Sequence, residues 1–216
     1  FHTNEDIMRL PQQPQSIIIV GGGFIAMEFA HVFDALGTKV HIVSRSALMR
    51  RIDADLGSRI NDLAVRRYDV RIGRTVADAV QDHHGITVTL DDGGSITADV
   101  LLVATGRIPN GDQMDLDLGG VEMTADGRVS VDEYGRSTSA EGVWALGDVS
   151  SPFMLKHVAN AEMRAVRHNL LHPDDLQKMP HDHVPSAVFT HPQIATVGLT
   201  EREARQAGHN ITVKIQ

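Results

Sequence analysis

A glycine-rich segment near the start of the chain has the spacing of a dinucleotide-binding turn. Gly21, Gly23 and Ala26 form the pattern G-x-G-x-x-A directly after the apolar run 16–20. In such a turn the first glycine permits a tight bend, the second lets a pyrophosphate approach the backbone, and the small third residue allows the next helix to pack closely. The amides that begin this helix then bind the anion. The spacing alone is a weak signal, and a purely structural turn is the alternative.

The elements around the turn are those that a dinucleotide site requires. The run 16–20 predicts a strand buried on both faces, because it is continuously apolar and β-branched. Residues 27–36 predict a helix that ends at Gly37, and 40–43 predict a second strand. This order of elements within about 30 residues favours dinucleotide binding over a structural turn.

The end of the second predicted strand distinguishes NAD from NADP. An NAD site places a carboxylate there to bind the ribose 2′-hydroxyl, whereas an NADP site must accommodate a phosphate. Ser44 and Arg45 stand at this position, Arg50 and Arg51 follow closely, and the first acid is Asp53. We therefore predict NADPH as the cofactor, with a solvated basic loop as the alternative.

The rest of the first 108 residues predicts one α/β unit. A helix is expected over 54–67, with a buried face formed by Leu56, Ile60, Leu63 and Ala64. The other elements are short β-branched runs, which predict strands at 70–72, 75–80, 86–90, 95–97 and 100–104. The three strands from 75 to 97 form a meander with a tight turn at 91–94. We predict a Rossmann-like dinucleotide-binding domain, with a parallel sheet plus an antiparallel meander.

The second half of the chain predicts shorter elements. Helices are expected at 156–171 and, after the capping box that Thr200 opens, up to Gly208. Residues 172–185 have the composition of a linker. The expected strands are at 121–123, 128–131, 143–146, 187–189 and 211–215. Because the last of these stops at the terminus, we interpret the chain as a fragment, and a frayed natural terminus is the alternative.

Composition excludes several kinds of chemistry. The 216 residues contain no cysteine, which removes thiol nucleophiles, disulfides and iron–sulfur ligation within this chain. The net charge of −8, with 28 acids against 20 Lys and Arg, argues against nucleic acid as a partner. No apolar run approaches the roughly 18 residues of a membrane span, so we expect a cytoplasmic protein without membrane contact. His83-His84 and the pair His181 and His183 lack metal-ligand spacing, so no metal site is predicted.

Five ordered segments resemble the class I flavoprotein disulfide reductases, the family of glutathione reductase and lipoamide dehydrogenase. They are Val20–Glu28, Ala104–Asn110, Val131–Tyr134 with Thr138, Ala145–Asp148 and Phe189–Glu201. Within the family, residues 148–160 are most similar to the branch that reduces mycothione, the disulfide of mycothiol.

The resemblance implies a division of the chain. Residues 1–14 would be a linker from an FAD domain outside this chain, and 15–108 the NADPH-binding domain. Residues 109–180 would be a central segment that contacts FAD, and 181–216 the truncated start of an α+β dimerisation domain.

The resemblance also implies roles for individual residues. Phe24 would cover the nicotinamide pocket, Glu28 would pair with a lysine beside the flavin, and Asp148 would bind the FAD ribitol. The alternatives are a core position for Phe24, an exposed helix acid at Glu28 and a structural cap at Asp148. Including the positive end of the helix that starts near residue 156, the expected cofactor-binding residues are Gly21, Gly23, Phe24, Ile25, Ala26, Glu28, Ser44, Arg45, Arg50, Arg51, Gly106, Gly147, Asp148, Lys156 and His157.

The expected function is the NADPH-binding portion of a homodimeric, flavin-dependent disulfide reductase. The resemblance implies that hydride passes from NADPH to FAD, and electrons then pass through a cysteine pair to mycothione. The family's cysteines and its catalytic His-Glu pair match nothing in this chain, so no catalytic residue is assigned. A soluble transhydrogenase, a metal-ion reductase and a non-catalytic nucleotide-binding module stay open as alternatives.

Overall fold

A computed structural model describes all 216 residues, which form two compact units. Unit 1 comprises residues 1–106 and 185–216, and unit 2 comprises residues 107–184. The fold is mixed α/β, and it contains the parallel sheet and the antiparallel meander that the sequence predicts. A second, two-stranded antiparallel sheet was not predicted. The domain boundaries implied by the family resemblance stay a prediction.

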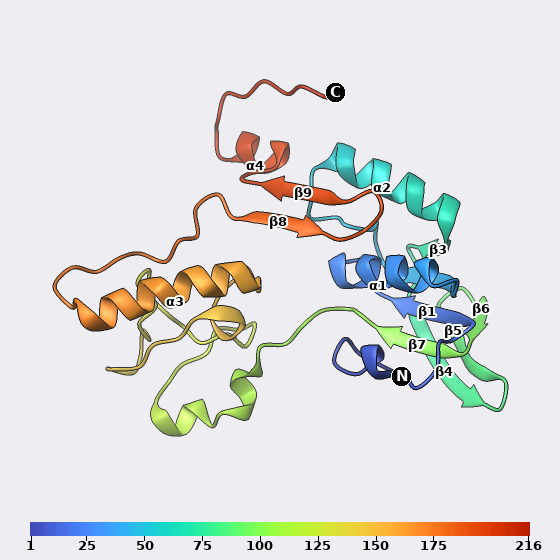
Figure 1. The fold of residues 1–216 in the computed structure, drawn as a ribbon, viewed down its shortest axis with the longest axis horizontal. Helices are drawn as coiled ribbons and strands as arrows, with labels where there is room; N and C mark the ends of the chain where they lie inside the picture. Colours follow the sequence, from blue (N-terminus) through green and yellow to red (C-terminus); the bar gives the residue numbers. More distant parts are fainter. The chain divides into compact units, whose positions relative to one another are not determined.

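A four-stranded parallel sheet forms the centre of unit 1 (Figure 1). Its strands lie in the order β3-β2-β1-β7. Their bounds are β1 (Ser16–Val20), β2 (Lys39–Ser44), β3 (Asp69–Ile72) and β7 (Val100–Val103). The apolar run of β1 is explained by the layers that cover both faces of the sheet.

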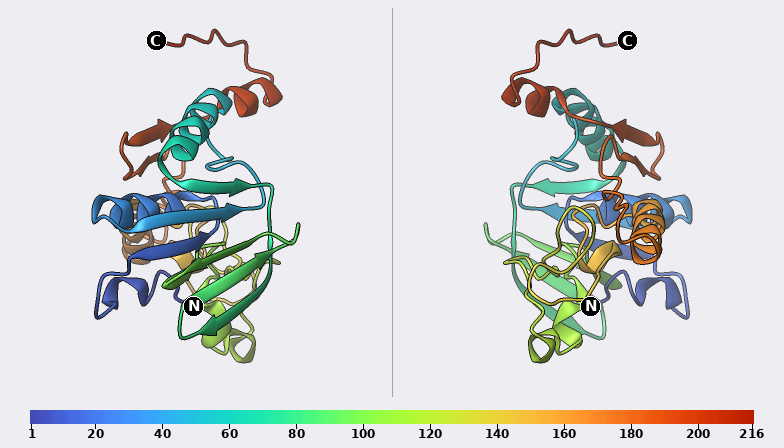
Figure 2. Two further views of the ribbon diagram at one scale, coloured as in Figure 1. Left: turned by 90° about the vertical axis from the view of Figure 1, so that its right-hand side faces the viewer. Right: turned by 90° about the vertical axis from the view of Figure 1, so that its left-hand side faces the viewer.

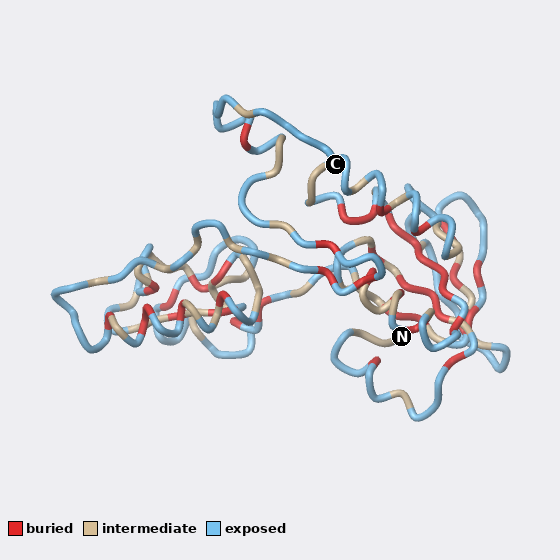
Figure 3. Tube along the Cα trace, turned by 45° about the horizontal axis from the view of Figure 1, so that its top comes forward, coloured by how far each residue is buried: buried red, intermediate tan, exposed pale blue.

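Alternate side chains of β1 pack against different layers. Figure 2 shows the backbone of these layers, with helices on one face of the parallel sheet and the meander on the other. Ile17 and Ile19 share a core cluster with residues of α1 (Phe24–Ala35) and α2 (Ala54–Arg67). Ile18 packs in a second cluster with the meander. The meander strands are β4 (Val76–Asp82), β5 (Gly85–Leu90) and β6 (Ser95–Ala98). Figure 3 shows the resulting core as buried stretches along the strands of unit 1.

The last part of the chain also belongs to unit 1. A hairpin of β8 (Pro185–Val188) and β9 (Ile194–Val197) precedes the short helix α4 (Glu201–Gln206). Val188 and Ile194 join the core cluster of α1 and α2. The Oδ1 atom of Asp53 accepts the Glu201 N–H at 2.9 Å, which links the start of α4 to the start of α2.

Unit 2 is built around one long helix, α3 (Lys156–Leu171). The rest is mainly turns and loops, with a small core of Val121, Val129 and Ala145. Short 3-10 turns occur at η2 (Asn110–Gln113), η3 (Leu116–Gly119) and η4 (Gly147–Val149), and a further one in unit 1 at η1 (Ile7–Arg9).

The structure corrects several predicted elements. Residues 211–216 form no strand, because no other segment pairs with them, and β9 lies in a segment where the sequence predicts no strand. The strands predicted at 121–123, 128–131 and 143–146 are only isolated bridges, such as Met123 with Val129. Helix α1 begins at Phe24 rather than Met27. On α2, Leu56 and Leu63 are exposed, so the buried stripe is narrower than predicted.

Candidate functional site

The glycine turn of unit 1 lies where three strands end. The Gly21 N–H donates to the Val43 carbonyl at 2.9 Å, and the Ala104 N–H donates to the Val20 carbonyl at 2.8 Å. Gly21 has a φ of 140°, and a Cβ there would collide with the Ala104 carbonyl oxygen. Only glycine fits this close approach of backbones.

This turn is also the point where the order of the sheet reverses. The chain passes from β1 to β2 and β3 on one side, and then returns to β7 on the other side of β1. Ligands of open α/β sheets bind outside the carboxyl ends of strands at such a switch point. Gly106, just beyond β7, has no atom within 4 Å of where its Cβ would stand, so this edge is open.

The beginning of α1 is suited to an anion. Gly23 is the N-cap residue, and no side chain caps the first amides of the helix. No neighbouring atom lies within 4 Å of the position that a Cβ of Gly23 would take. Ala26 is fully buried, whereas Phe24 is partly exposed and Ile25 half-buried. The helix dipole favours negative charge at this end. The residues therefore fit a pyrophosphate.

A basic loop follows β2 next to the glycine turn. Ser44 is buried, and its hydroxyl donates to the Ser46 carbonyl at 2.8 Å. Arg45, Arg50 and Arg51 are exposed, and none of them forms an ion pair with a carboxylate of the chain. A surface pocket of about 510 Å³ lies between this loop and α2, and Arg50 is one of the residues that line it.

Glu28 on α1 has a partner within unit 1. Its Oε1 atom accepts the backbone N–H of Phe189, just beyond β8, at 3.0 Å. This bond joins α1 to the C-terminal hairpin. The acid is therefore more than a solvated helix residue, and its pairing with a lysine outside the chain stays a prediction.

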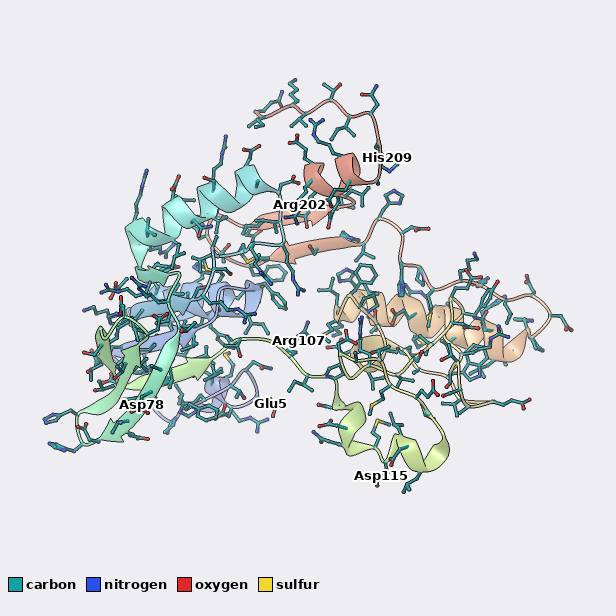
Figure 4. All side chains as sticks on the ribbon, turned by 180° about the vertical axis from the view of Figure 1, so that it is seen from behind. Glu5, Asp78, Arg107, Asp115, Arg202 and His209 are labelled. Carbon is teal, nitrogen blue, oxygen red and sulfur yellow. The ribbon has the colours of Figure 1, made fainter.

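The second group of expected residues lies in unit 2. Asp148 is in η4, and its side chain is 54% exposed. Arg107, labelled in Figure 4, donates through Nη1 to Asp148 Oδ2 at 3.1 Å and through Nη2 to the Met154 carbonyl at 2.9 Å. Asp148 is thus oriented by a guanidinium and still faces solvent, as a residue that accepts hydrogen bonds from a sugar chain would require.

Gly147 and the start of α3 are the other places in unit 2 where cofactor-binding residues are expected. Gly147 has a φ of 71°, and its N–H donates to Glu162 Oε2 at 2.7 Å. Lys156 and His157 begin α3 and are exposed, and no side chain caps this helix. The helix dipole makes this end of α3 positive.

Sequence reasoning missed Arg107, Glu162 and Asn61. Arg107 lies within a segment that was recognised, but no role was assigned to it. Glu162 lies on the face of α3 that the apolar spacing predicts to be buried, and this position is the sequence signal for a buried acid. No local sequence pattern indicates that Asn61 binds a loop, because its partner Leu48 is 13 residues away.

Neither unit offers a metal centre or a membrane span. No three His, Asp or Glu side chains are grouped so that they could hold a metal ion. No helix is both long enough and apolar enough to cross a bilayer.

Comparisons with known proteins agree with this geometry. Residues 1–165 match the pattern of the pyridine nucleotide-disulphide oxidoreductases, and residues 184–216 match the dimerisation domain of the same family. Mycothione reductase of Mycobacterium tuberculosis is 53% identical over 100% of this chain and 48% of its own length. Glutathione reductase of Burkholderia cepacia is 36% identical over 98% of this chain and 47% of its own length.

A solved structure gives the same result. An HOCl-induced flavoprotein disulfide reductase from Escherichia coli has a TM-score of 0.87 and 28% identity, covering 96% of this chain and 48% of its own. The chain therefore spans about half the length of the relatives that it matches.

Proposed function

The chain belongs to the pyridine nucleotide-disulphide oxidoreductase family, and we propose that it is the NADPH-binding portion of a flavin-dependent reductase that acts on mycothione. The similarity to mycothione reductase over the whole chain supports this substrate. Because the chain spans about half of its relatives, the activity belongs to the longer protein.

One observation carries the choice of NADPH. Arg45, Arg50 and Arg51 project from a loop that follows β2, beside the switch point, and they have no carboxylate partner in the chain. The 2′-phosphate of NADPH is expected at this end of the second strand. Free guanidinium groups bind phosphate through charge-assisted, often bidentate, hydrogen bonds.

The other residues would bind and orient the two cofactors. The Gly21 turn and the first amides of α1 would hold the pyrophosphate, and the half-exposed Phe24 would shield the nicotinamide end. Asp148, oriented by Arg107, would accept hydrogen bonds from the flavin's sugar chain. Bound FAD would supply the acceptor for hydride and the route for electrons to a disulfide.

We also propose that the longer protein is a cytoplasmic homodimer. The match of residues 184–216 to the family's dimerisation domain supports association of two copies. The matched segment includes the β8–β9 hairpin, which packs against α1 and α2 within unit 1.

Calorimetric titration of NADPH and NADH into the 216-residue chain tests the cofactor. Replacing Arg45 with Ala removes one charge-assisted hydrogen bond, worth about 1.5–3 kcal/mol, so NADPH should bind roughly 10- to 100-fold more weakly. NADH lacks the 2′-phosphate, so its affinity should barely change. Arg66→Ala, on the exposed side of α2, removes the same charge away from the loop and should leave both affinities intact.

An equal loss for both cofactors would contradict the assignment. Arg45 would then support the fold or the pyrophosphate rather than the 2′-phosphate. A chain that binds neither cofactor would contradict the nucleotide site itself.

A further inference from the structure

The loop that carries the three arginines is held by one side chain of α2. The Oδ1 atom of Asn61 accepts the Leu48 N–H at 2.9 Å. Its Nδ2 donates to the Leu48 carbonyl at 3.1 Å and to the Gly57 carbonyl at 2.6 Å. One carboxamide therefore satisfies both backbone groups of Leu48, as a neighbouring strand would. Leu48 itself is fully buried, so the loop is anchored at its centre.

The next residue forms a second anchor, this time to the glycine turn. The Met49 N–H donates to the Gly22 carbonyl at 2.7 Å. Met49 has a φ of 53°, in the left-handed region that a residue with a side chain adopts only when its surroundings impose it. The bonds at Leu48 and Met49 thus fix the backbone immediately before Arg50.

We propose that Asn61 is a positioning residue for recognition of the 2′-phosphate, an inference that rests on the proposed function. It makes no contact with the cofactor. By clamping Leu48, it holds the loop in the conformation in which the arginines surround one phosphate. Discrimination between NADPH and NADH would then depend on a neutral side chain of the neighbouring helix.

The physical reason is preorganisation. A loop that is already ordered does not have to lose conformational entropy when the phosphate binds. Without the carboxamide, the backbone groups of Leu48 lose their partners and the loop samples other conformations. NADH makes no contact with this loop through a phosphate, so its binding does not use the clamp.

The experiment compares NADP⁺ and NAD⁺ binding by the 216-residue chain with that by its Asn61→Ala variant. We expect the Kd of NADP⁺ to rise about 10-fold, and that of NAD⁺ to change by less than about 2-fold. Leu63→Ala, on an exposed position of the same helix, is the control for general weakening of α2. If Asn61→Ala does not fold, Asn61→Ser, which is too short to bridge both groups of Leu48, replaces it.

Limited trypsin digestion without nucleotide gives an independent readout. Cleavage after Arg45, Arg50 and Arg51 should accelerate in the Asn61 variant relative to cleavage after Arg128 in unit 2, whereas Leu63→Ala should not change this ratio. Unchanged cleavage, or an equal loss of affinity for both nucleotides, would overturn the proposal.

The measurements distinguish a wrong cofactor assignment from a wrong role for Asn61. If the unmodified chain binds NADP⁺ and NAD⁺ equally, the proposed function is wrong in its cofactor and the role of Asn61 is wrong with it. If the unmodified chain prefers NADP⁺ and the Asn61 variant keeps the full preference, only the role of Asn61 is wrong.

Discussion

Asp132 shows how a single carboxylate can organise a turn in unit 2. Its Oδ1 accepts the N–H groups of Tyr134 at 2.9 Å and Arg136 at 3.0 Å, and its Oδ2 accepts Arg136 Nε at 2.8 Å. Partial burial raises the pKa of Asp132, but these hydrogen bonds and the charge of Arg136 outweigh that effect and hold the pKa below its usual value of 3.8. The ionised form therefore stabilises the fold.

We predict that the contribution of Asp132 to stability is lost in acid. Because its pKa is lower in the folded chain, the stabilisation is fully present above pH 4 or so and disappears as pH falls through the folded value. Asp132→Asn should lower the free energy of unfolding at pH 7, and the difference from wild type should shrink at pH 3.

Urea unfolding followed by the fluorescence of Trp144, the single tryptophan, would measure this difference. The backbone of Trp144 forms an isolated β-bridge with that of Arg136, so the fluorescence of Trp144 reports on the same turn. A difference that stays constant between pH 7 and pH 3 would contradict the role of the charge.

At the scale of elements, α3 carries a buried acid that ties unit 2 together. Glu162 is 1% exposed, and its two oxygens have different partners. Oε2 accepts the Gly147 N–H at 2.7 Å, and Oε1 pairs with His181 Nε2 at 2.6 Å. A buried carboxylate is costly unless it is paired, so this arrangement fixes the η4 turn and the segment of His181 to one helix.

We predict that Glu162→Leu destabilises unit 2 by about 3 kcal/mol, the usual cost of breaking a buried pair. The leucine would fill the space of the glutamate but leave the Gly147 N–H and His181 without partners. Urea unfolding monitored at Trp144 provides the measurement. Glu141→Leu, at an exposed acid, is the matched control and should cost little.

A double-mutant cycle sharpens this test. His181→Gln should cost less than Glu162→Leu, and the two losses should not add, because both remove the same pair. Additive losses would mean that the two side chains act separately.

At the scale of the molecule, unit 1 exposes apolar side chains on its C-terminal segment. Phe189 is 64% exposed, Val197 64% and Leu199 58%. All three lie within the segment that matches the family's dimerisation domain. Phe189 follows β8, Val197 ends β9 and Leu199 lies just beyond it, so exposed apolar side chains are spread along the surface of this segment.

We predict that the 216-residue chain associates reversibly through this surface. Sedimentation velocity should show a weight-average mass that rises with concentration. Replacing Phe189 and Val197 together with Ser should shift the chain toward monomer, because less apolar area would be buried. Phe1→Ser, an exposed aromatic at the other end of the chain, is the control. A mass that is independent of concentration would rule out the association.

Local sequence patterns are sufficient to predict several elements of the fold. The helices over 54–67 and 156–171 have the bounds that apolar spacing predicted, and the G-x-G-x-x-A turn lies between a buried strand and a helix. The capping box at Thr200 also forms, with its hydroxyl accepting the Glu203 N–H at 3.3 Å. Period, capping and turn chemistry act over a few residues, so a sequence records them directly.

Features that depend on partners distant in the sequence are visible only in the folded chain. Residues 211–215 alternate like a strand but form none, because a strand exists only when another backbone pairs with it. Ser44 is one of the expected cofactor-binding residues, and tertiary packing buries it. Asn61 and Glu162 hold backbone groups 13 and 15 residues away, and no local pattern indicates which side chain will meet which turn. Local patterns predict a nucleotide site at the glycine turn, whereas tertiary packing determines which side chains hold the loops in place.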